Sequence, residues 1–562
     1  MEVDEALTRL GRYSRWQMLS YALLSICAYV PGCWHMLSIV FIGGMPDYNC
    51  NVSSGTILPK KKNLEDELIT DPCREYVDLA VDNTTETCSN GYNFSGDFEL
   101  TIVDDYMLVC EQEYLVELSQ TIFVVGVMFG AIACTSLADM YGRKWVHLAC
   151  QWILVVVGVV TAFAHNYEFF LFLRFLTGAL QQGIILAAFV QGCEIFAADQ
   201  RTFAGLGVNI VWAIAMMVLA GLAYALRNWR YFQLAITLPG IWSIAGIWFF
   251  PESIPWLVAN GKIDRAEDII KKAAKMNGVE KNYPKNIFPR HEREEKSEPN
   301  DEAQTETAAK KSKFQSMREK LCGKDDGEIK KENIFTVLKH AKLRVYVFVM
   351  CSLWFVNSLV YFGLSLSTSA LAGDRYLNFF LSGAVELPAY IQCLIVLGRY
   401  GRRVPLCVYH AIAGIGLMVT LAIPKTTAAG DSLNWLSIIF TMIGKFGITC
   451  SFGTIFLYAG EIFPTNVRNT GMGMCSVAAR IGGMLAPFST LLARKIPWLP
   501  GVIFGVLSII VGGLTLLLPE TLGQPLPQTI DDMKQWNRKR RKSSHIITPI
   551  EDFQTQSNDT KL

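Results

Sequence analysis

The sequence has few charged residues for its length. Asp, Glu, Lys and Arg make up 18% of its 562 residues, whereas a soluble protein carries about 25%. Residues 251–344 alone hold 38 of the 101 charged side chains, so long runs elsewhere are almost uncharged. Together with a mean hydropathy of +0.28, this shortage excludes an ordinary soluble enzyme and indicates a protein that crosses the membrane several times. The net charge of +1 also excludes a strongly basic nucleic-acid binder.

Several motifs that carry chemistry are absent from the sequence. It has no P-loop, no His-Glu-x-x-His zinc motif and no Gly-x-Ser-x-Gly nucleophile elbow, so we expect neither an enzyme nor an ATP-driven pump. The eleven cysteines outside residues 43–118 lack metal-ligand spacing, and we expect no metal site and no cofactor. A transport activity would then draw on an ion or substrate gradient, with Na⁺ and H⁺ as the candidate coupling ions.

The sequence instead contains a series of long apolar runs. A helix needs roughly 20 apolar residues to cross about 30 Å of hydrocarbon, and twelve runs meet this length. The first is too long for the apolar region of a signal peptide and follows a mixed-charge N-terminus, so we expect it to remain as a membrane helix. The sequence thus predicts an all-α membrane protein with twelve transmembrane helices, near residues 17–42, 119–138, 146–165, 168–192, 203–225, 231–250, 345–367, 377–397, 404–423, 435–459, 470–492 and 499–518.

The segment 43–118 differs from the other connections in its cysteines and its glycosylation sequons. Four cysteines suit an oxidising compartment, and three N-x-S/T sequons suit a glycosylated surface, so we place this segment outside the cell. An even number of spans then puts both termini in the cytoplasm of a plasma-membrane protein. The four cysteines allow three disulfide pairings. The residues concerned are Cys50, Cys73, Cys88 and Cys110, with the sequons at Asn51, Asn83 and Asn93.

The positive-inside rule supports most of this topology. The basic segments 399–403 and 538–542 fall on the cytoplasmic side. Four residues fall against the rule in short outer loops, namely Arg227, Arg230, Arg494 and Lys495. The predicted organisation is a cytoplasmic N-terminus (1–16), an N-terminal six-helix bundle (17–250) with the glycosylated loop (43–118), a cytoplasmic loop with an amphipathic helix (251–344), a C-terminal six-helix bundle (345–518) and a cytoplasmic tail (519–562).

The two halves of the sequence resemble each other. Three short segments of the first half recur in the second half in the same order and at the same places relative to the spans. This repeat predicts two six-helix halves in parallel arrangement with a substrate site at mid-depth between them, as in the major facilitator architecture. The recurring segments are Tyr141-Gly142-Arg143-Lys144 with Tyr400-Gly401-Arg402-Arg403, Glu194-Ile195-Phe196 and Arg201 with Glu461-Ile462-Phe463 and Arg468, and Pro251-Glu252-Ser253 with Pro519-Glu520-Thr521.

Eight segments spread along the chain match motifs of one transporter family. They are 136–144, 251–253, 266–278, 361–366, 385–390, 444–447, 458–469 and 519–530. On these segments the chain resembles, over nearly its whole length, the organic cation, anion and carnitine transporters of the major facilitator superfamily, and the carnitine branch in particular. The resemblance implies a twelve-helix carrier that works by alternating access. Two positions depart from the family pattern: Ser136 stands where the signature between helices two and three usually has Gly, and Gly398 stands where its second copy usually has Asp.

Four ionisable residues interrupt the predicted spans, where a charge costs at least about 2.5–3.5 kcal/mol unless it faces a cavity or a partner. Arg480 has small neighbours and offers a planar fork for a carboxylate; the resemblance implies Arg here in anion and carnitine carriers and Asp in cation-selective ones. Glu386 precedes the helix breaker Pro388. We expect one of two roles for this acid: it binds a cationic group, Na⁺ or a proton, or it forms an ion pair with Lys445 or Arg480. We expect structural roles for Lys445 and Arg174. Lys445 is also a candidate substrate contact.

Aromatic side chains complement a quaternary ammonium group, which is attracted to ring faces. Tyr390 also stands where the family's anion carriers tend to have Lys, and together with Arg480 this favours a zwitterion with a carboxylate, such as carnitine. Gln181, followed by Gln182, adds a polar group that could orient a ligand. The aromatic candidates for the substrate site are Trp212, Trp354, Tyr361, Phe362, Tyr390 and Phe452.

Charged residues at the cytoplasmic ends of the spans are candidates for a gate. We expect them to pair with one another and with helix ends while the inward side is closed, and to separate when it opens. Ser543 and Ser544 resemble phosphorylation sites in a basic context. The gating candidates are Asp139, Arg143, Lys144, Glu194, Arg201, Glu461 and Arg468.

The sequence therefore predicts a polyspecific secondary carrier of small organic ions, above all carnitine-like zwitterions or organic cations, that works as a monomer in the lipid bilayer. An organic anion exchanger is the alternative with the same fold. A non-transporting membrane receptor is the alternative from a different class, but such a protein has no need of charges within its spans.

Overall fold

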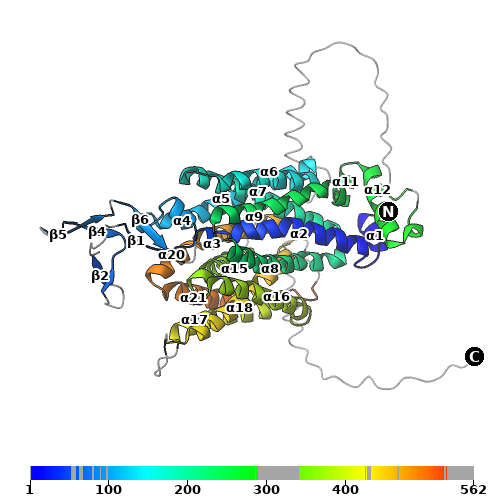
Figure 1. Cartoon of the computed structure of the whole chain (residues 1–562). Helices are drawn as coiled ribbons and strands as arrows, with labels where there is room; N and C mark the ends of the chain where they lie inside the picture. The colour runs from blue at the N-terminus through cyan, green and yellow to red at the C-terminus, as the bar shows by residue number, and fades with distance from the viewer. Residues whose placement is uncertain are drawn as a thin grey trace, which may run out of the picture.

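The computed structural model consists of two bundles of helices that lie side by side (Figure 1). Within the described residues, twelve helical segments are long and apolar enough to cross a membrane, which confirms the predicted number. The strands lie at one end of the bundles, called here the hairpin end, and α1, α11 and α12 lie at the other, called here the α12 end. The structure describes residues 2–527 except 52–58, 63–67, 79–81, 89, 97–98, 285, 289–340, 372, 425, 427–431, 465–466 and 525–526.

The first bundle holds the six spans that precede the long connection. Its last span does not stay α-helical, because the segment η3 adopts the tighter 3₁₀ conformation and begins beside Pro239. The elements are α2 (Arg15–Leu37), α3 (Ile39–Ile42), η1 (Cys110–Gln112), α5 (Tyr114–Tyr141), α6 (Arg143–Ala162), α7 (Tyr167–Glu194), η2 (Ala198–Gln200), α8 (Arg201–Ala225), α9 (Trp229–Thr237), η3 (Leu238–Ala245) and α10 (Gly246–Phe249).

The second bundle repeats this order of spans. Its first span buries residues such as Trp354 and Tyr361 in the largest apolar core of the described chain. The elements are α15 (Ala341–Leu366), η5 (Ser367–Ala370), α16 (Arg375–Tyr400), α17 (Arg403–Ala422), α18 (Asn434–Ile462), α19 (Arg468–Leu485), α20 (Phe488–Lys495), α21 (Leu499–Leu514) and η6 (Thr515–Leu517).

The two bundles touch through α8 of the first and α16 of the second. Gly383 permits this approach, because a Cβ atom there would lie 3.0 Å from Met216 Cβ and 3.3 Å from the carbonyl oxygen of Ala213. Spans that are far apart in sequence thus line the middle of the molecule, where the repeat places the substrate site.

Short helices cover the α12 end of the first bundle. The amphipathic helix expected within residues 251–344 is present as α12 (Ile263–Asn277) and ends at Gly278, which has a φ of +70°. It packs with α1 (Val3–Arg9) and α11 (Ile254–Ala259) around an apolar core that includes Leu7, Trp256 and Ile270. The short helix η4 (Glu280–Asn282) follows. The basic cluster 538–542 and the candidate phosphorylation sites Ser543 and Ser544 lie outside the described residues.

The segment at the hairpin end contains three two-stranded antiparallel sheets, an addition to the predicted all-helical architecture. Two disulfides, Cys50–Cys88 and Cys73–Cys110, select one of the three possible pairings. Asn51 and Asn93 lie side by side, and both are exposed, as a glycosylation acceptor must be. The side chain of Asn83 lies outside the described part. The elements are β1 (Asp47–Cys50) with β6 (Tyr92–Ser95), β2 (Lys60–Lys62) with β3 (Leu68–Thr70), β4 (Arg74–Asp78) with β5 (Asp82–Thr87), and the helix α4 (Ile102–Asp105).

Candidate functional site

A buried ion pair lies inside the second bundle. Glu386 on α16 and Lys445 on α18 approach to 3.0 Å between Oε1 and Nζ, and their side chains are 0% and 1% exposed. Pro388 lies inside α16 two residues after the glutamate, where its missing N–H leaves a carbonyl of the preceding turn without its usual donor. Of the two bridges expected for Glu386, the structure forms the one to Lys445.

The ion pair can accept one more partner. Lys445 donates a hydrogen bond to the Ser365 hydroxyl and lies 3.6 Å from the centre of the Tyr361 ring. The other carboxylate oxygen of Glu386, Oε2, is buried without a hydrogen-bond partner in the described part of the chain. Because buried carboxylate oxygens normally accept hydrogen bonds, this atom is a candidate contact for a cationic ligand, a coupling ion or a proton.

Aromatic rings from three helices gather next to this pair. Tyr361 on α15 contacts Phe362 and Phe452, in each case with ring centroids 5.2 Å apart. Trp212, on α8 of the first bundle, donates from Nε1 to the Tyr361 hydroxyl over 3.0 Å. The structure therefore brings four of the predicted aromatic residues together, and the cluster they form reaches both bundles.

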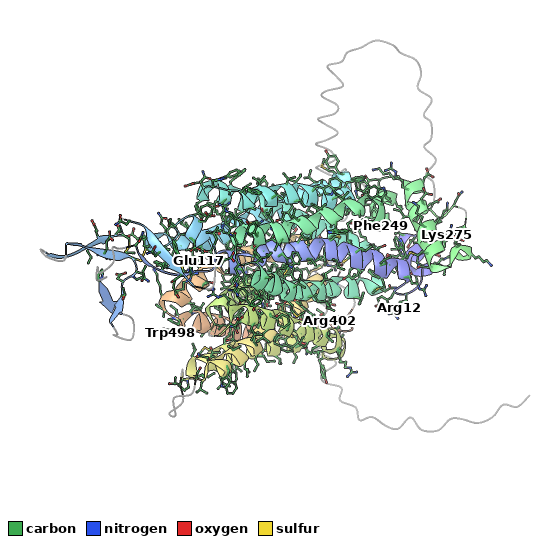
Figure 2. The ribbon with its side chains drawn as sticks, viewed as in Figure 1. Arg12, Glu117, Phe249, Lys275, Arg402 and Trp498 are labelled. Carbon is green, nitrogen blue, oxygen red and sulfur yellow. A yellow bond between two sulfur atoms is a disulfide. The ribbon has the colours of Figure 1, made fainter. Side chains whose placement is uncertain are left out.

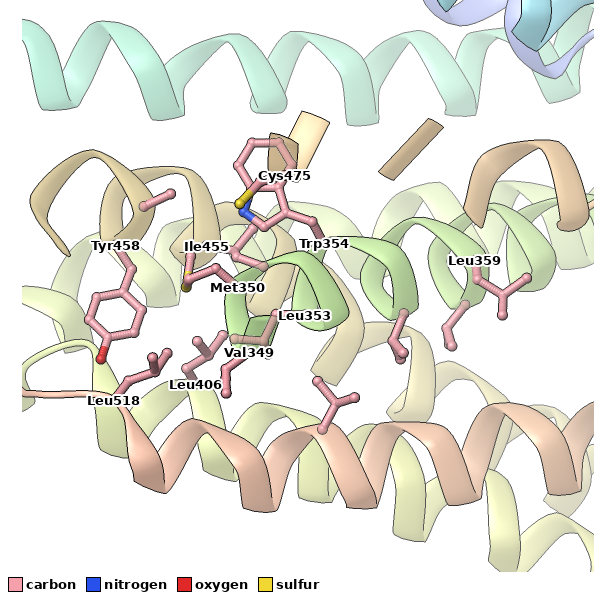
Figure 3. Close-up of a cluster of buried hydrophobic side chains, with 14 of the residues drawn as sticks. Val349, Met350, Leu353, Trp354, Leu359, Leu406, Ile455, Tyr458, Cys475 and Leu518 are labelled. Carbon is pink, nitrogen blue, oxygen red and sulfur yellow. The ribbon is translucent and has the colours of Figure 1, made fainter. Parts of the chain in front are cut away.

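A second group of rings extends the cluster. The Trp354 ring centroid is 4.3 Å from that of Phe456, which in turn is 5.7 Å from Phe452. Trp354 is buried among side chains that include Cys475 of α19 (Figure 3). Sequence reasoning missed Phe456, although it follows Phe452 by four residues on α18, the spacing that puts two side chains on one helix face.

Arg480 on α19 carries a charge that no described residue neutralises. Its guanidinium Nε is buried without a hydrogen-bond acceptor among the described residues. Gly482, two residues later, lies so close to the carbonyl oxygen of Phe355 that a Cβ atom would collide with it. Two residues span about 3 Å of helix, so Arg480 lies at about the depth of Trp354. An unpaired cation at this depth is suited to bind a ligand carboxylate.

Tyr390 and Gln181 are both buried. Tyr390 follows the acid Glu386 by one turn of α16. Its ring lies against Gly453 of α18, where a Cβ atom would be 3.4 Å from the ring. Gln181 on α7 donates to the carbonyl oxygen of Gly32 over 2.8 Å. Its side-chain oxygen Oε1 is buried without a hydrogen-bond partner among the described residues, so a ligand-orienting role for Gln181 stays a prediction.

Arg174 lies in a polar network of the first bundle, and no carboxylate among the described residues pairs with it. It donates to the carbonyl oxygen of His35 over 3.2 Å and to the amide oxygen of Gln120, and its guanidinium lies 4.5 Å from the centre of the Phe123 ring. These contacts join α2, α5 and α7, which agrees with a structural role for Arg174. Sequence reasoning missed His35 and Gln120, because their residue types give no sign of a partner on another helix.

The predicted gating residues of the first half meet at the α12 end. Arg143 lies 3.0 Å from Asp139 and 3.6 Å from Glu194. Lys144 donates to the carbonyl oxygen of Ile247 over 2.7 Å. All five residues belong to the first bundle, so these contacts tie helices of one half together.

The second half repeats this arrangement with one loss. Arg402, the counterpart of Arg143, lies 2.8 Å from Glu461. Its other guanidinium nitrogen donates to the carbonyl oxygen of Leu397 over 3.0 Å, because Gly398 offers no carboxylate there. The departure at Gly398 from the family pattern therefore replaces an ion pair by a hydrogen bond to the backbone.

Two glutamates that sequence reasoning did not select complete both networks. Glu252 accepts a hydrogen bond from the backbone N–H of Lys144 at 3.1 Å, and Glu520 accepts one from that of Arg402 at 2.9 Å. Each carboxylate thus satisfies a free N–H group at a helix N-terminus and opposes the positive end of the helix dipole. The recurrence of the segments 251–253 and 519–521 was the signal in the sequence that could have found them.

Two gating candidates have other partners than expected. Arg201 pairs with Asp4 of α1 at 2.8 Å, which joins the N-terminal helix to α8. Arg468 donates from Nε to the carbonyl oxygen of Phe463 over 3.3 Å. A part in gating stays a prediction for both residues.

An ion pair that the sequence did not predict joins the two bundles at the hairpin end. Glu117 on α5 and Arg494 on α20 approach to 3.4 Å, and they are 4% and 25% exposed. Nearby, the Thr121 hydroxyl donates to the carbonyl oxygen of Met484 over 3.0 Å. Figure 2 labels Glu117 at this end of the molecule. These polar contacts hold the two bundles together on the hairpin side.

We expect removal of the Arg494 side chain to weaken the contact that closes the two bundles against each other at the hairpin end. Arg494→Ala leaves Glu117 buried without its cation, which weakens the closed form by about 1–3 kcal/mol. Thr490 lines a small cavity beside the pair, and a cysteine at this position can be labelled by a membrane-impermeant thiol reagent. Labelling of this cysteine should be about tenfold faster with Arg494→Ala than with Arg494 in place. The double exchange Glu117→Arg and Arg494→Glu should restore slow labelling. Equal labelling rates with and without Arg494 would contradict closure by this pair.

Comparison with known proteins gives matches over nearly the whole chain. The family model described as "Sugar (and other) transporter" matches residues 24–531. The chain is 36% identical to the "Organic cation transporter protein" of Drosophila melanogaster over 96% of both chains, and 33% identical to the human "Organic cation/carnitine transporter 2" over 98% of both. Among solved structures, a partially occluded inward-open form of the xylose transporter XylE from E. coli is similar at a TM-score of 0.57 and 14% identity, over 90% of this chain and 99% of that one. This likeness concerns the fold.

Proposed function

The chain belongs to the organic cation and carnitine transporters of the major facilitator superfamily, and from that premise we propose that its cargo is a small organic ion with a positive charge, best represented by a carnitine-like zwitterion. Members of this superfamily carry solutes and are not enzymes. The names of the relatives point to organic cations and carnitine, and the interior of this chain offers matching groups for both ends of a zwitterion.

The observation that carries the proposal is that the aromatic cluster extends from the depth of Arg480, a cation without a partner among the described residues, to the ion pair of Glu386, an acid with a free oxygen. A carboxylate would accept two parallel hydrogen bonds from the guanidinium. A quaternary ammonium would lie against the rings around Tyr361 and be attracted by the Glu386 charge. An organic anion exchanger is less well supported, because the names of the relatives point to organic cations and carnitine.

The ion pair at the hairpin end and the networks at the α12 end suggest how access alternates. Glu117 and Arg494 link the two bundles, whereas the contacts of Arg143 and Arg402 stay within one bundle. We propose that the halves rock as rigid units about the central cluster, that the hairpin end faces outward at the plasma membrane, and that both termini are cytoplasmic. The free oxygen of Glu386 is the proposed contact for a coupling Na⁺ or H⁺.

Uptake measurements test the proposed cargo directly. Cells that express the chain should take up radiolabelled carnitine saturably, and excess unlabelled carnitine should remove at least about nine tenths of that uptake when its concentration is ten times the half-saturating one. Tetraethylammonium should compete less well, because it cannot engage Arg480, and p-aminohippurate should compete least. Replacement of Na⁺ by Li⁺ in the same assay tests Na⁺ coupling, and a change of external pH at constant Na⁺ tests H⁺ coupling. Strong competition by p-aminohippurate alone would instead favour the anion exchanger.

A further inference from the structure

The short helix α3 is buried near the hairpin end of the molecule (Figure 1). It follows α2 after a single residue, Ser38, and its sequence, Ile-Val-Phe-Ile over Ile39–Ile42, contains no polar side chain. An apolar segment of a membrane protein can face lipid without penalty, because lipid tails are as apolar as its side chains. Each of these four residues is nevertheless at most 7% exposed. Other parts of the protein therefore surround α3.

Phe41 carries the contact between α3 and the second bundle. Its ring is stacked on that of Tyr376, with centroids 5.7 Å and planes 6° apart, and it meets the ring of Phe379 edge to face at 5.0 Å. Both partners lie in the first two turns of α16. On the other side, the Phe41 ring meets Phe232 of α9 in the first bundle at 6.0 Å. One aromatic side chain thus bridges the two halves.

Other residues of α3 also face the second bundle. Ile39 and Val40 line the small cavity beside the Glu117–Arg494 pair, together with Leu366 of α15. The helix is therefore in contact with α16 through one part of its surface and with the end of α15 through another. Because α3 continues the first span after one residue, it remains part of the first bundle.

The contact of α3 with α16 lies directly outside the central site. The first turn of α16 is at the hairpin end, beside Trp229. Phe379 precedes Glu386 by seven residues, which corresponds to two turns and about 10 Å, and Ser382 lies between them on the same face and is 1% exposed. A solute that moves from the hairpin end along this face passes Phe41 before it reaches Glu386. Apolar side chains packed at such a point exclude water and ions.

We propose that α3 is a plug that seals the hairpin side of the substrate route, and that Phe41 makes and breaks the seal. The inference rests on the proposed alternating access. The plug moves with the first bundle, and the Phe41 ring separates from Tyr376 and Phe379 when the hairpin side opens, which frees the route to the central site. This seal is apolar, and it adds to the ion pair of Glu117 and Arg494, which ties the same end through charge.

Labelling of a buried cysteine tests the seal whatever the cargo is. Ser382→Cys places a thiol one turn inside Phe379, and its reaction with a membrane-impermeant thiol reagent is measured on cells. Adding Phe41→Ala should make this reaction at least about tenfold faster, because two aromatic contacts between the bundles are lost. Adding Phe380→Ala instead, at the next position of α16 but 42% exposed, should leave the rate unchanged. An unchanged rate in Phe41→Ala would overturn the proposal.

Cross-linking tests the movement itself, and it does not depend on the folding of the alanine variant. A bifunctional methanethiosulfonate reagent links Phe41→Cys to Phe379→Cys, and peptide mass spectrometry verifies the link. Carnitine uptake should then be lost and should return on reduction. The matched pair, Phe41→Cys with Phe232→Cys, lies within the first bundle, so its link should leave uptake at the level of the unlinked variant under the same reducing and non-reducing conditions.

The two experiments separate the plug from the cargo. Full uptake by protein with a verified link between positions 41 and 379 would show that α3 and α16 stay together throughout the cycle, and the proposal would fail. Absence of carnitine uptake in the unmodified protein would instead contradict the proposed cargo, while the labelling rates would still decide whether α3 is a plug.

Discussion

Replacement of Arg480 by Asp is expected to lower carnitine uptake at least about hundredfold while the protein still reaches the cell surface. The guanidinium has no acceptor for its buried Nε among the described residues, so the substitution breaks no observed ion pair within the protein. It removes the group proposed to bind the substrate carboxylate and replaces it with a like charge. A hydrogen bond to a charged group contributes about 1.5–3 kcal/mol, and 2.7 kcal/mol corresponds to about a hundredfold change in affinity.

Two controls separate recognition from general damage. Uptake of tetraethylammonium, which has no carboxylate, should survive in Arg480→Asp. Arg480→Lys should keep part of the carnitine uptake, because an ammonium preserves the charge but loses the planar, two-pronged geometry. Surface biotinylation gives the amount of protein for each variant. If carnitine uptake per surface molecule stays unchanged in Arg480→Asp, recognition of the carboxylate by this residue is excluded.

The membrane architecture was largely predictable from sequence because hydrophobic length is a local property. Each span is a continuous apolar run, and all twelve predicted runs fall on helical segments of the described chain. The contrast with the hairpin end is instructive. There, four cysteines permit three pairings, and the bonds Cys50–Cys88 and Cys73–Cys110 depend on how segments distant in sequence, such as β1 and β6, come together in three dimensions.

The partners of the charged residues were less predictable, because they lie on helices that are distant in sequence. The predicted topology places Arg230 and Arg494 on the outer side, against the positive-inside rule, and the sequence alone counts them only as exceptions. In the structure Arg230 pairs with Asp105 at 2.7 Å and Arg494 with Glu117 at 3.4 Å. Their charges are compensated locally, so they weigh less against the predicted topology than a count of basic residues suggests.

The same limit applies to the central site. Composition and spacing selected the residues Glu386, Lys445 and Tyr361, and the structure places all three in contact. Sequence spacing could not show which cation the glutamate meets, because α16 and α18 are separated by a whole span in sequence and meet only through their direct packing in the fold. Nor could it show that one carboxylate oxygen stays without a partner, since satisfaction of a polar atom depends on every helix around it.

Removal of the Glu386 charge is expected to reduce both stability and uptake. Glu386→Gln preserves size but leaves Lys445 buried, 1% exposed, without its counter-ion. Breaking a buried ion pair by removal of one partner costs about 3–5 kcal/mol, so the melting temperature of the detergent-purified protein should fall by several degrees. Uptake of carnitine and of tetraethylammonium should fall together, because both cations lose the same attraction.

The double variant Glu386→Gln with Lys445→Met separates the two roles of the acid. Removal of both charges leaves no uncompensated ion, and replacing a buried pair by uncharged side chains of similar size is often neutral or stabilising. Its melting temperature should therefore return close to that of the unmodified protein. Uptake should stay low, because the carboxylate that attracts the cationic end of the substrate is still missing. Recovery of transport together with stability would show that Glu386 serves only to hold α16 against α18, and the free Oε2 atom would then have no part in binding the substrate.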